Sequence, residues 1–332
     1  MRPFMVARVR TNITTYLARP NRALTKPMPK QTTHHLLMVR PRDFAIGSPT
    51  HIDNLFQAVA LPEDQREIAA AAQKEFNNYV EVLRANGLRI TVMEDQEGIA
   101  TPDSVFPNNW FSTHDDGLYV TYPMFWPQRR IERREDVLAI LDRDHKINRT
   151  LALEHWENDG HILEGTGSLV LDRQNRIAYA CFSERATKSA IEDWCIAMDY
   201  SPITFNALDK REGVIYHTNV MLAVGNKVAL VSLDSVRDPA EKSKLTESLA
   251  LTGKKIIGLS LDQVDGFAGN ALEVTTPNGP AWVMSTTAFN VLDTAQKEAL
   301  GAPIIHAPLP IIEKYGGGSA RCMISEIFLP EK

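Results

Sequence analysis

The sequence predicts an α/β fold assembled from a repeated module. Short apolar stretches with strand character alternate with longer stretches whose apolar residues recur at helical spacing. A hairpin, a helix and a further strand recur about every 50–60 residues, which is typical of a repeated αβ module rather than of one doubly wound sheet. No low-complexity linker interrupts residues 35–332, which we therefore interpret as one domain.

The first half of the chain alternates strands and helices. Residues 36–39 are Leu-Leu-Met-Val and predict a buried strand. Between residues 62 and 86 the apolar side chains fall at helical spacing, and Gly87 follows where a helix C-terminal cap is expected. The elements expected after it are strands at 88–93 and 118–122, a helix over 131–141, strands at 168–172 and 177–182, and a helix over 188–198.

The second half continues the alternation. Strands at 220–224 and 228–232 are expected to form a hairpin through Gly225 and Asn226, a dipeptide suited to a tight hairpin turn. The elements expected after it are a helix over 240–251, a strand at 255–259, a strand at 281–285, a helix over 294–300, and strands at 304–305 and 324–329.

The first 42 residues differ from the rest in charge. They contain nine Lys and Arg and no Asp or Glu, whereas the remainder carries 27 basic against 41 acidic residues. An acid-free, Arg-containing N-terminus is typical of an organellar transit peptide and also of a disordered extension, which is the interpretation we favour. We assign residues 1–34 to this extension, and expect a cytoplasmic protein, or a mitochondrial-matrix protein if the segment is a transit peptide.

The composition is that of an ordinary globular protein, with 44 % apolar and 23 % charged residues. A net charge of −5 gives no reason to expect nucleic acid or an anionic membrane as a partner. No apolar run approaches the roughly 20 residues that span a bilayer. The three cysteines are widely spaced, without the CxxC pair of a zinc or redox site, so neither a metal nor another cofactor is expected.

Four short segments are polar or Gly-rich where a core would be apolar. Each lies at a predicted strand end or loop, where a rigid scaffold presents functional groups. They are Phe-Pro-Asn-Asn-Trp-Phe at 106–111, Glu-Gly-Thr-Gly-Ser at 164–168, Tyr-His-Thr-Asn-Val at 216–220 and Gly-Gly-Gly-Ser-Ala-Arg-Cys at 316–322.

Three side chains in these segments form a set suited to covalent hydrolysis. Cys322 follows a glycine run that permits close backbone approach to a ligand, although a lone cysteine is more commonly a small core residue. His217 and Glu164 are, taken singly, equally compatible with structural roles. Together, a thiolate can attack, an imidazole can shuttle protons, and a carboxylate can orient the imidazole or hold a substrate nitrogen.

These four segments, in this order, resemble those of the guanidino-group-modifying superfamily, which includes arginine deiminases, dimethylarginine hydrolases and amidinotransferases. Within it the chain is most similar to the citrulline-utilisation hydrolases, over residues 35–330. The resemblance implies the pentein fold, five ββαβ modules around a pseudo-five-fold axis, with an active site in the central channel.

The resemblance also implies roles for individual residues. Cys322 resembles the family nucleophile, His217 the general acid and base, and Glu164 the catalytic carboxylate. Phe106 resembles the aromatic side chain that packs on the planar guanidino group. Arg185 resembles the arginine that binds the substrate α-carboxylate, for which a bidentate guanidinium is well suited, although an exposed helix arginine remains the alternative.

The chain departs from the arginine deiminases at Asn109 and Asn219, where those enzymes have Asp. A carboxylate suits a cationic guanidinium, whereas a carboxamide is neutral and both donates and accepts hydrogen bonds. The two substitutions therefore favour a neutral ureido group such as that of citrulline.

The expected function is a hydrolase that converts citrulline to ornithine, ammonia and carbon dioxide through a covalent Cys322 intermediate. Backbone N–H groups of the 316–322 turn are expected to stabilise the tetrahedral species. Alternatives are an arginine dihydrolase or deiminase, an amidinotransferase, and a non-enzymatic binding protein on the same fold. The only expected partner is a small amino-acid substrate, and homo-oligomerisation stays open.

Overall fold

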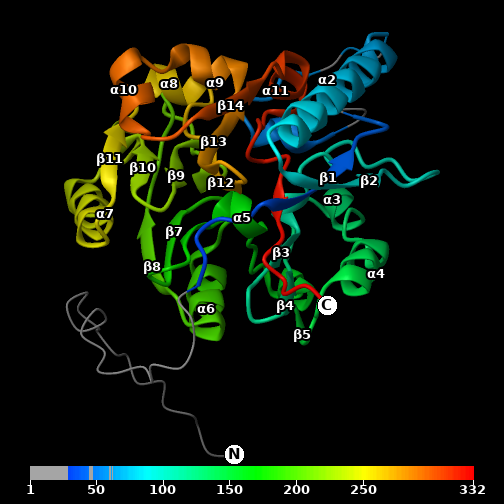
Figure 1. Ribbon diagram of the computed structural model, residues 1–332, viewed down its shortest axis with the longest axis horizontal. Helices are drawn as coiled ribbons and strands as arrows, with labels where there is room; N and C mark the ends of the chain where they lie inside the picture. The colour runs from blue at the N-terminus through cyan, green and yellow to red at the C-terminus, as the bar shows by residue number, and fades with distance from the viewer. Residues whose placement is uncertain (1–28, 45–47, 60, 62) are drawn as a thin grey trace, which may run out of the picture.

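The structure, a computed structural model, describes residues 29–44, 48–59, 61 and 63–332 (Figure 1). Its strands form five separate three-stranded sheets, and every sheet has the same topology. In each, the central strand pairs antiparallel with one neighbour and parallel with the other. The predicted α/β fold with a repeated module is confirmed, and the repeat is the pentein arrangement that the resemblance implied.

The strands are numbered in chain order. They are β1 (His35–Arg40), β2 (Arg89–Glu94), β3 (Phe111–Thr113), β4 (Leu118–Thr121), β5 (Arg149–Ala152), β6 (Val170–Asp172), β7 (Ile177–Cys181), β8 (Ser201–Phe205), β9 (Leu222–Val224), β10 (Val228–Val231), β11 (Lys255–Gly258), β12 (Leu272–Thr276), β13 (Gly279–Ser285), β14 (Ile304–Ala307) and β15 (Ser325–Glu326). The sheets are β15-β1-β2, β3-β4-β5, β6-β7-β8, β9-β10-β11 and β12-β13-β14.

The helices α2, α4, α6 and α7 lie at the periphery, whereas the short helix α5 lies among the central strands (Figure 1). The α-helices are α2 (Gln65–Ala85), α3 (Pro127–Arg130), α4 (Glu135–Asp144), α5 (Gly165–Ser168), α6 (Lys188–Met198), α7 (Pro239–Leu251), α8 (Leu261–Asp265), α9 (Thr286–Val291), α10 (Thr294–Ala299) and α11 (Pro310–Gly316). The 3-10 helices are η1 (Thr50–Ile52), η2 (Pro107–Asn109), η3 (Glu154–Asp159), η4 (Thr218–Val220) and η5 (Leu233–Ser235).

The ring of sheets is closed by its two ends. β15, near the C-terminus, pairs antiparallel with β1, so that Leu36 lies opposite Glu326 and Leu37 opposite Ser325. β15 thus completes the first sheet as β3, β6, β9 and β12 complete the other four. These five strands face the centre, where β6 contacts β9, β9 contacts β12, and β15 contacts β3.

Most predicted elements are present, and the differences have local causes. The predicted helix 188–198 coincides with α6, whereas the predicted helix 131–141 starts only at Glu135, after the separate turn α3. Ser168, predicted as strand, ends α5. The strands β3, β5, β8 and β12 were not predicted. β3 is only three residues long, and the other three are partly exposed and contain polar residues, so none shows a continuous apolar run.

The described part of the predicted N-terminal extension is packed against the domain. Gln31 is buried, and its side chain donates to the carbonyls of Leu171 and Val224, at 2.8 and 3.0 Å, and accepts from the Arg173 N–H. Packed structure therefore begins by residue 31 rather than at residue 35. The rest of the predicted extension, residues 1–28, lies outside the described residues.

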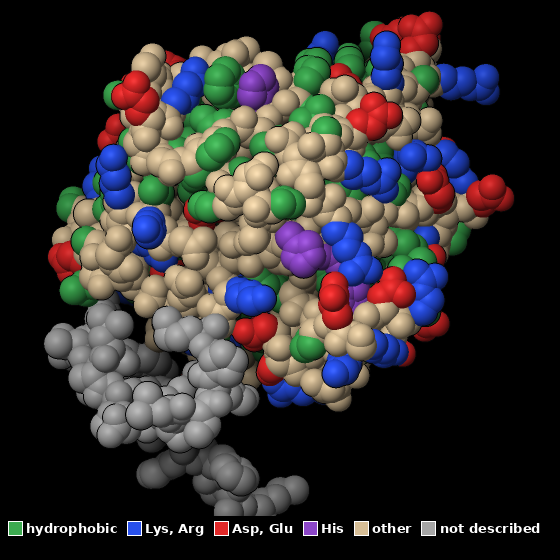
Figure 2. Space-filling model, in the orientation of Figure 1, with side chains coloured by type: hydrophobic (Ala, Val, Ile, Leu, Met, Phe, Trp, Pro, Cys, Tyr) green, Lys and Arg blue, Asp and Glu red, His purple; other side chains and the backbone are tan. Residues whose placement is uncertain are grey.

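Helix α2 shows how the apolar pattern of the sequence builds the core. All five positions that predicted this helix are buried, and they pack with residues of β1, β13 and β14. They are Ile68, Ala72, Phe76, Tyr79 and Leu83. On the face shown in Figure 2, Lys and Arg side chains are interspersed with Asp and Glu. Among the described helices, none has the length and apolar character to cross a membrane.

Two buried histidines join β1 to the end of α4. His35 Nδ1 lies 3.2 Å from His145 Nε2, and His145 Nδ1 lies 3.2 Å from the Leu141 carbonyl oxygen. Because a carbonyl only accepts, His145 carries its proton on Nδ1, and His35 must donate to its Nε2. His35 Nε2 then accepts from the Thr91 hydroxyl at 2.8 Å. Burial, with the positive charge of Arg89, lowers the pKa of His35 to about 3.

The histidine pair predicts a specific loss of stability in acid. Unfolded histidine binds a proton near pH 6.5, but folded His35 does so only near pH 3, so this contribution is complete above pH 6.5 and is lost as the pH falls toward 3. We expect His35→Gln to make the free energy of unfolding less steep in pH between 6.5 and 4, by at most about 1.4 kcal/mol per pH unit. Urea unfolding across this range, beside wild type, measures the slope, and equal slopes would contradict the lowered pKa of folded His35.

Candidate active site

The turns that precede the five central strands meet at one place. These turns are η2 before β3, α5 before β6, η4 before β9, residues 267–271 before β12, and residues 317–324 before β15. α5 contacts both η2 and η4. The fold therefore gathers the four sequence segments that we singled out, and it adds a fifth segment from the module that begins with β12.

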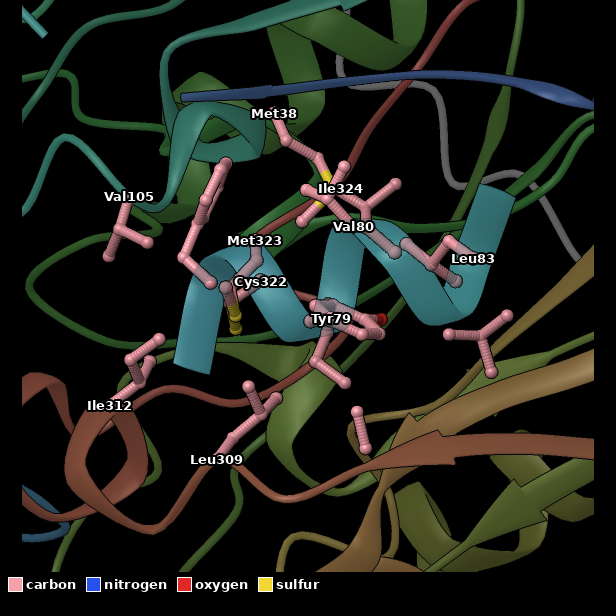
Figure 3. Packing of buried hydrophobic residues seen from close by; sticks show 14 of the residues in the cluster. Met38, Tyr79, Val80, Leu83, Val105, Leu309, Ile312, Cys322, Met323 and Ile324 are labelled. Atoms are coloured by element: carbon pink, nitrogen blue, oxygen red, sulfur yellow. The ribbon is translucent and has the colours of Figure 1, made fainter. Parts of the chain in front are cut away.

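Cys322 lies in the turn before β15 and is only 2 % exposed. It belongs to the same buried cluster as Tyr79, Met323 and Ile324 (Figure 3). Its sulfur is approached by two carboxamides, with Asn270 Nδ2 at 3.1 Å and Asn219 Nδ2 at 3.4 Å. Sequence reasoning placed Asn219 in the site but missed Asn270.

The glycine run before Cys322 makes room for an aromatic ring. A Cβ atom added at Gly316 would lie 2.7 Å from the Phe106 ring, and one at Gly318 would lie 3.0 Å from it. The close approach that the run permits is therefore to Phe106. The Cys322 N–H donates to the Ser319 carbonyl, and the Arg321 N–H donates to Asn270. These two N–H groups already have partners, so our expectation that this turn supplies donors to a tetrahedral species is not supported for them.

Glu164 and His217 form a fully buried hydrogen-bonded pair. His217 Nε2 lies 2.9 Å from Glu164 Oε2, and the Phe125 N–H donates to Glu164 Oε1. Burial alone would raise the pKa of Glu164, but the positive charges of Arg185 and Arg129 and the bond to His217 outweigh it and lower this pKa to about 2. Ionised Glu164 only accepts, so Nε2 of His217 carries its proton and Nδ1 is free to accept one.

The imidazole is held neutral by its surroundings. Burial lowers the pKa of His217, and Arg185 and Arg129 lower it further, against the opposing effect of Glu164. A buried neutral imidazole with one nitrogen fixed by a carboxylate is the arrangement that a general base requires. His217 and Cys322 line the same small cavity.

Arg129 is a site residue that sequence reasoning missed. It is 2 % exposed, forms a bidentate ion pair with Glu132 and donates to Asn109 Oδ1 at 2.9 Å. Asn109 Nδ2 in turn donates to Asn108. The Asn109 carboxamide is therefore oriented by an arginine, although Oδ1 keeps a second lone pair.

Arg185 is buried and not an exposed helix residue. Its guanidinium makes two hydrogen bonds to Asp53, at 2.6 and 2.8 Å, and lies 3.6 Å from Glu164. Asp53 also accepts from the Trp126 indole. The bidentate position that we assigned to a substrate α-carboxylate is thus filled by Asp53 in this conformation, and a substrate carboxylate would have to displace it.

The cavity is also lined by a carboxylate that no sequence motif marks. Asp103 is buried and accepts hydrogen bonds from the Ser48 and Thr50 hydroxyls. Among the described residues no Lys or Arg forms an ion pair with it. Within the part of the chain that the structure describes, no group of three or more His, Cys, Asp or Glu side chains is arranged to hold a metal ion.

Comparisons with known proteins identify the family and the fold of the chain. The family described as N,N dimethylarginine dimethylhydrolase, eukaryotic, matches residues 40–329. The chain belongs to this family. It is therefore a member of the guanidino-modifying hydrolases with the pentein fold, as the resemblance of the four segments had indicated. A search of curated protein sequences found no match.

Solved structures with the same fold are distant in sequence. The apo structure of ArgZ, an arginine dihydrolase from the ornithine-ammonia cycle in cyanobacteria, has a TM-score of 0.67 at 17 % identity, over 88 % of this chain and 40 % of that one. An AgrE variant complexed with L-arginine has a TM-score of 0.69 at 17 % identity, over 90 % and 40 %. A dimethylarginine dimethylaminohydrolase adduct has a TM-score of 0.60 at 14 % identity, over 89 % and 99 %. The chain thus spans about 40 % of the length of full ArgZ and AgrE.

The buried charges of the site predict a cost for removing Glu164. Because its folded pKa is below its unfolded value, Glu164 stabilises the fold above pH 4.5, and this contribution is lost as the pH falls toward 2. We expect Glu164→Gln to lower the free energy of unfolding at pH 7 by about 3 kcal/mol, because two buried arginines lose their shared carboxylate. The exposed Glu184→Gln is the matched control, and urea unfolding at pH 7 and pH 3 should show a smaller deficit at pH 3. An equal deficit at both values would contradict the charge argument.

Proposed function

We propose that this chain is a cysteine-dependent hydrolase of a ureido amino acid, with citrulline as its substrate. One observation carries the choice of substrate. Among the described residues, the side chains within hydrogen-bonding distance of the Cys322 sulfur are the carboxamides of Asn219 and Asn270, which are neutral. Glu164 already interacts with Arg129 and Arg185, so its charge is compensated. This end of the cavity therefore favours a neutral head group.

The proposed reaction proceeds in two covalent steps. The thiol proton of Cys322 passes to Nδ1 of His217, the sulfur bonds to the ureido carbon, and the C–N bond to the terminal nitrogen breaks as His217 returns the proton to release ammonia. Water, deprotonated by His217, then attacks the thiocarbamate, breaks the C–S bond and restores the thiol. The released carbamate decomposes to ornithine and carbon dioxide. One citrulline and one water thus give ornithine, ammonia and carbon dioxide.

The other end of the substrate is matched by charged groups around the same cavity. Asp103, whose carboxylate forms no ion pair with a described Lys or Arg although Arg129 lies nearby, is the proposed acceptor for the α-ammonium group. Arg185 is the proposed partner of the α-carboxylate, which takes the place of Asp53 when substrate binds. Phe106 forms the wall beside the planar ureido group.

A guanidino substrate, arginine or a methylated arginine, is the second candidate. The family match favours it, since that family is described by dimethylarginine. A guanidinium would also pair with the negative charge of the Cys322 thiolate, which a neutral ureido group does not. The two candidates differ in whether the head group of the substrate carries a charge.

Product analysis distinguishes these candidates. Purified full chain is given citrulline, arginine and N,N-dimethylarginine in separate reactions, and ornithine, citrulline and ammonia are measured. We expect ornithine and ammonia from citrulline alone. Turnover of arginine or dimethylarginine without citrulline turnover would establish the second candidate. Cys322→Ala should abolish all turnover, while Cys195→Ala, which changes another buried cysteine far along the chain on α6, should retain it.

Asn219→Asp tests the charge argument directly. The new carboxylate would lie beside the Cys322 sulfur with no arginine bonded to it, unlike a carboxylate at 109, which Arg129 would neutralise. We expect kcat/KM for citrulline to fall by about tenfold or more, which corresponds to about 1.4 kcal/mol, and the ratio of arginine to citrulline turnover to rise. Asn109→Asp is the matched comparison and should change that ratio less. Unchanged citrulline kinetics in Asn219→Asp would refute the argument.

A further inference from the structure

The module that begins with β12 contributes one polar side chain to the centre of the ring, and none of the four sequence segments includes it. Asn270 precedes β12 as Asn109 precedes β3, Asn219 precedes β9, and Cys322 precedes β15. Its side chain is fully buried. It contacts the turn before β15 and the turn before β9, which are the two segments that meet at the Cys322 sulfur.

The hydrogen bonds of Asn270 determine which way its amide points. Oδ1 accepts from the N–H groups of Arg321, at 3.0 Å, and Cys322, at 3.3 Å. A flipped amide would turn its NH₂ group toward these two donors, so the orientation is fixed by the backbone. Nδ2 must therefore donate, and it does so to the Asn219 carbonyl at 3.1 Å and to the Cys322 sulfur at 3.1 Å.

Asn219 does not give the sulfur an equally defined donor. Its Nδ2 is 3.4 Å and its Oδ1 is 3.6 Å from the sulfur of Cys322. Nδ2 also points to the Thr166 carbonyl, at a longer 3.5 Å. The sulfur thus has one short donor with a fixed direction, and this donor is Asn270.

The backbone around Asn270 holds it in place before any substrate arrives. A Cβ atom added at Gly269 would lie 2.4 Å from the Val220 carbonyl oxygen, so this segment packs directly on the backbone of the turn before β9. Phe267, at the start of the same turn, has a positive φ of 60°. The Asn270 N–H donates to the Phe267 carbonyl at 2.9 Å. The carboxamide needs no reorganisation to meet the sulfur.

We propose that Asn270 is a catalytic residue that stabilises the Cys322 thiolate through its Nδ2–H and holds the Cys322 turn through its Oδ1. This proposal rests on Cys322 as the nucleophile in the proposed function, but not on the choice of substrate. A hydrogen bond donated to an anionic sulfur is stronger than one donated to a neutral thiol, so the carboxamide favours the reactive form. His217 is neutral beside Glu164 until it takes the thiol proton, so Asn270 supplies a donor to the sulfur that does not depend on a charged imidazole.

Asn270→Asp separates the two roles of this side chain. The carboxylate keeps an oxygen for the N–H groups of Arg321 and Cys322, but it replaces the donor to the sulfur with a second oxygen. Asn278→Asp is the matched control, because it makes the same charge change on the exposed end of the β12–β13 hairpin. The titratable and charged groups around the site are the same in both variants; they are His217, Tyr216, Glu164, Asp103, Arg129, Arg185 and Arg321.

The test measures Cys322 alkylation by iodoacetamide as a function of pH, with Cys322→Ala to subtract the two other buried cysteines. We expect Asn270→Asp to move the midpoint of the alkylation curve at least one pH unit higher, about a tenfold loss of reactive thiolate near neutral pH. Asn278→Asp should follow wild type. With citrulline, kcat should fall about tenfold or more while KM stays within about threefold, because Nδ2 contacts the sulfur and not the far end of the cavity.

An alkylation curve of Asn270→Asp that superimposes on wild type would overturn the proposal. Thermal unfolding confirms that each variant is folded. If Asn270→Asp is not, Asn270→Ser, whose short hydroxyl cannot reach both turns, is measured in the same way with the same expected shift. Alkylation needs no substrate, so a wild type that leaves citrulline untouched would refute the choice of substrate while the alkylation result still decides the role of Asn270.

Discussion

The pairing of β15 with β1 is the constraint on which the site depends. In four of the sheets the three strands are consecutive in the chain. The remaining sheet instead combines β15, near the C-terminus, with β1 and β2 from the start of the domain. Thr113 holds the other side of the β15 segment, because its hydroxyl donates to the Glu326 carbonyl and accepts from the Phe328 N–H. Cys322 lies three residues before this pairing, so the sulfur reaches the centre of the ring only when the ring is closed. Folding and assembly of the site are therefore one event.

A second constraint is the compensation of buried charge. Arg129 and Arg185 are both almost fully buried and both lie within 4 Å of Glu164, while Glu132 and Asp53 supply further carboxylates. A buried charge without a partner would be far more costly than any of these pairs is stabilising. These charges also orient neutral side chains. Arg129 orients the carboxamide of Asn109. Arg129 and Arg185 together keep Glu164 ionised, and ionised Glu164 orients the imidazole of His217. The buried ion pairs thus fix the orientation of the neutral side chains beside Cys322.

The sequence predicted the repeated fold. It also predicted those site residues that lie in a recognisable polar or glycine-rich segment before a strand. Cys322, His217, Glu164, Phe106 and Asn219 stand in glycine-rich or polar segments between apolar strands, and the topology brings those segments together. Arg185 could be predicted as a residue type but not as the partner of Asp53, because that contact joins segments 132 residues apart. Arg129 and Asp103 stand in stretches with no periodic pattern, and their burial is decided entirely by tertiary contacts.

Asn270 could have been predicted from the repeat, although its own segment has no recognisable motif. Its segment, Phe-Ala-Gly-Asn-Ala, has one glycine and one polar residue, and nothing in it alone differs from an ordinary turn. Its place in the repeat distinguishes it. In four modules a site residue lies in the turn before the central strand, and in the fifth module the equivalent residue is Asn270. A repeat whose members all point at one axis makes the equivalent position in every module a candidate. The symmetry of the backbone therefore identifies a candidate site position that the residue type alone does not. Asn270, the position without a recognisable motif, makes the shorter of the two amide contacts to the sulfur.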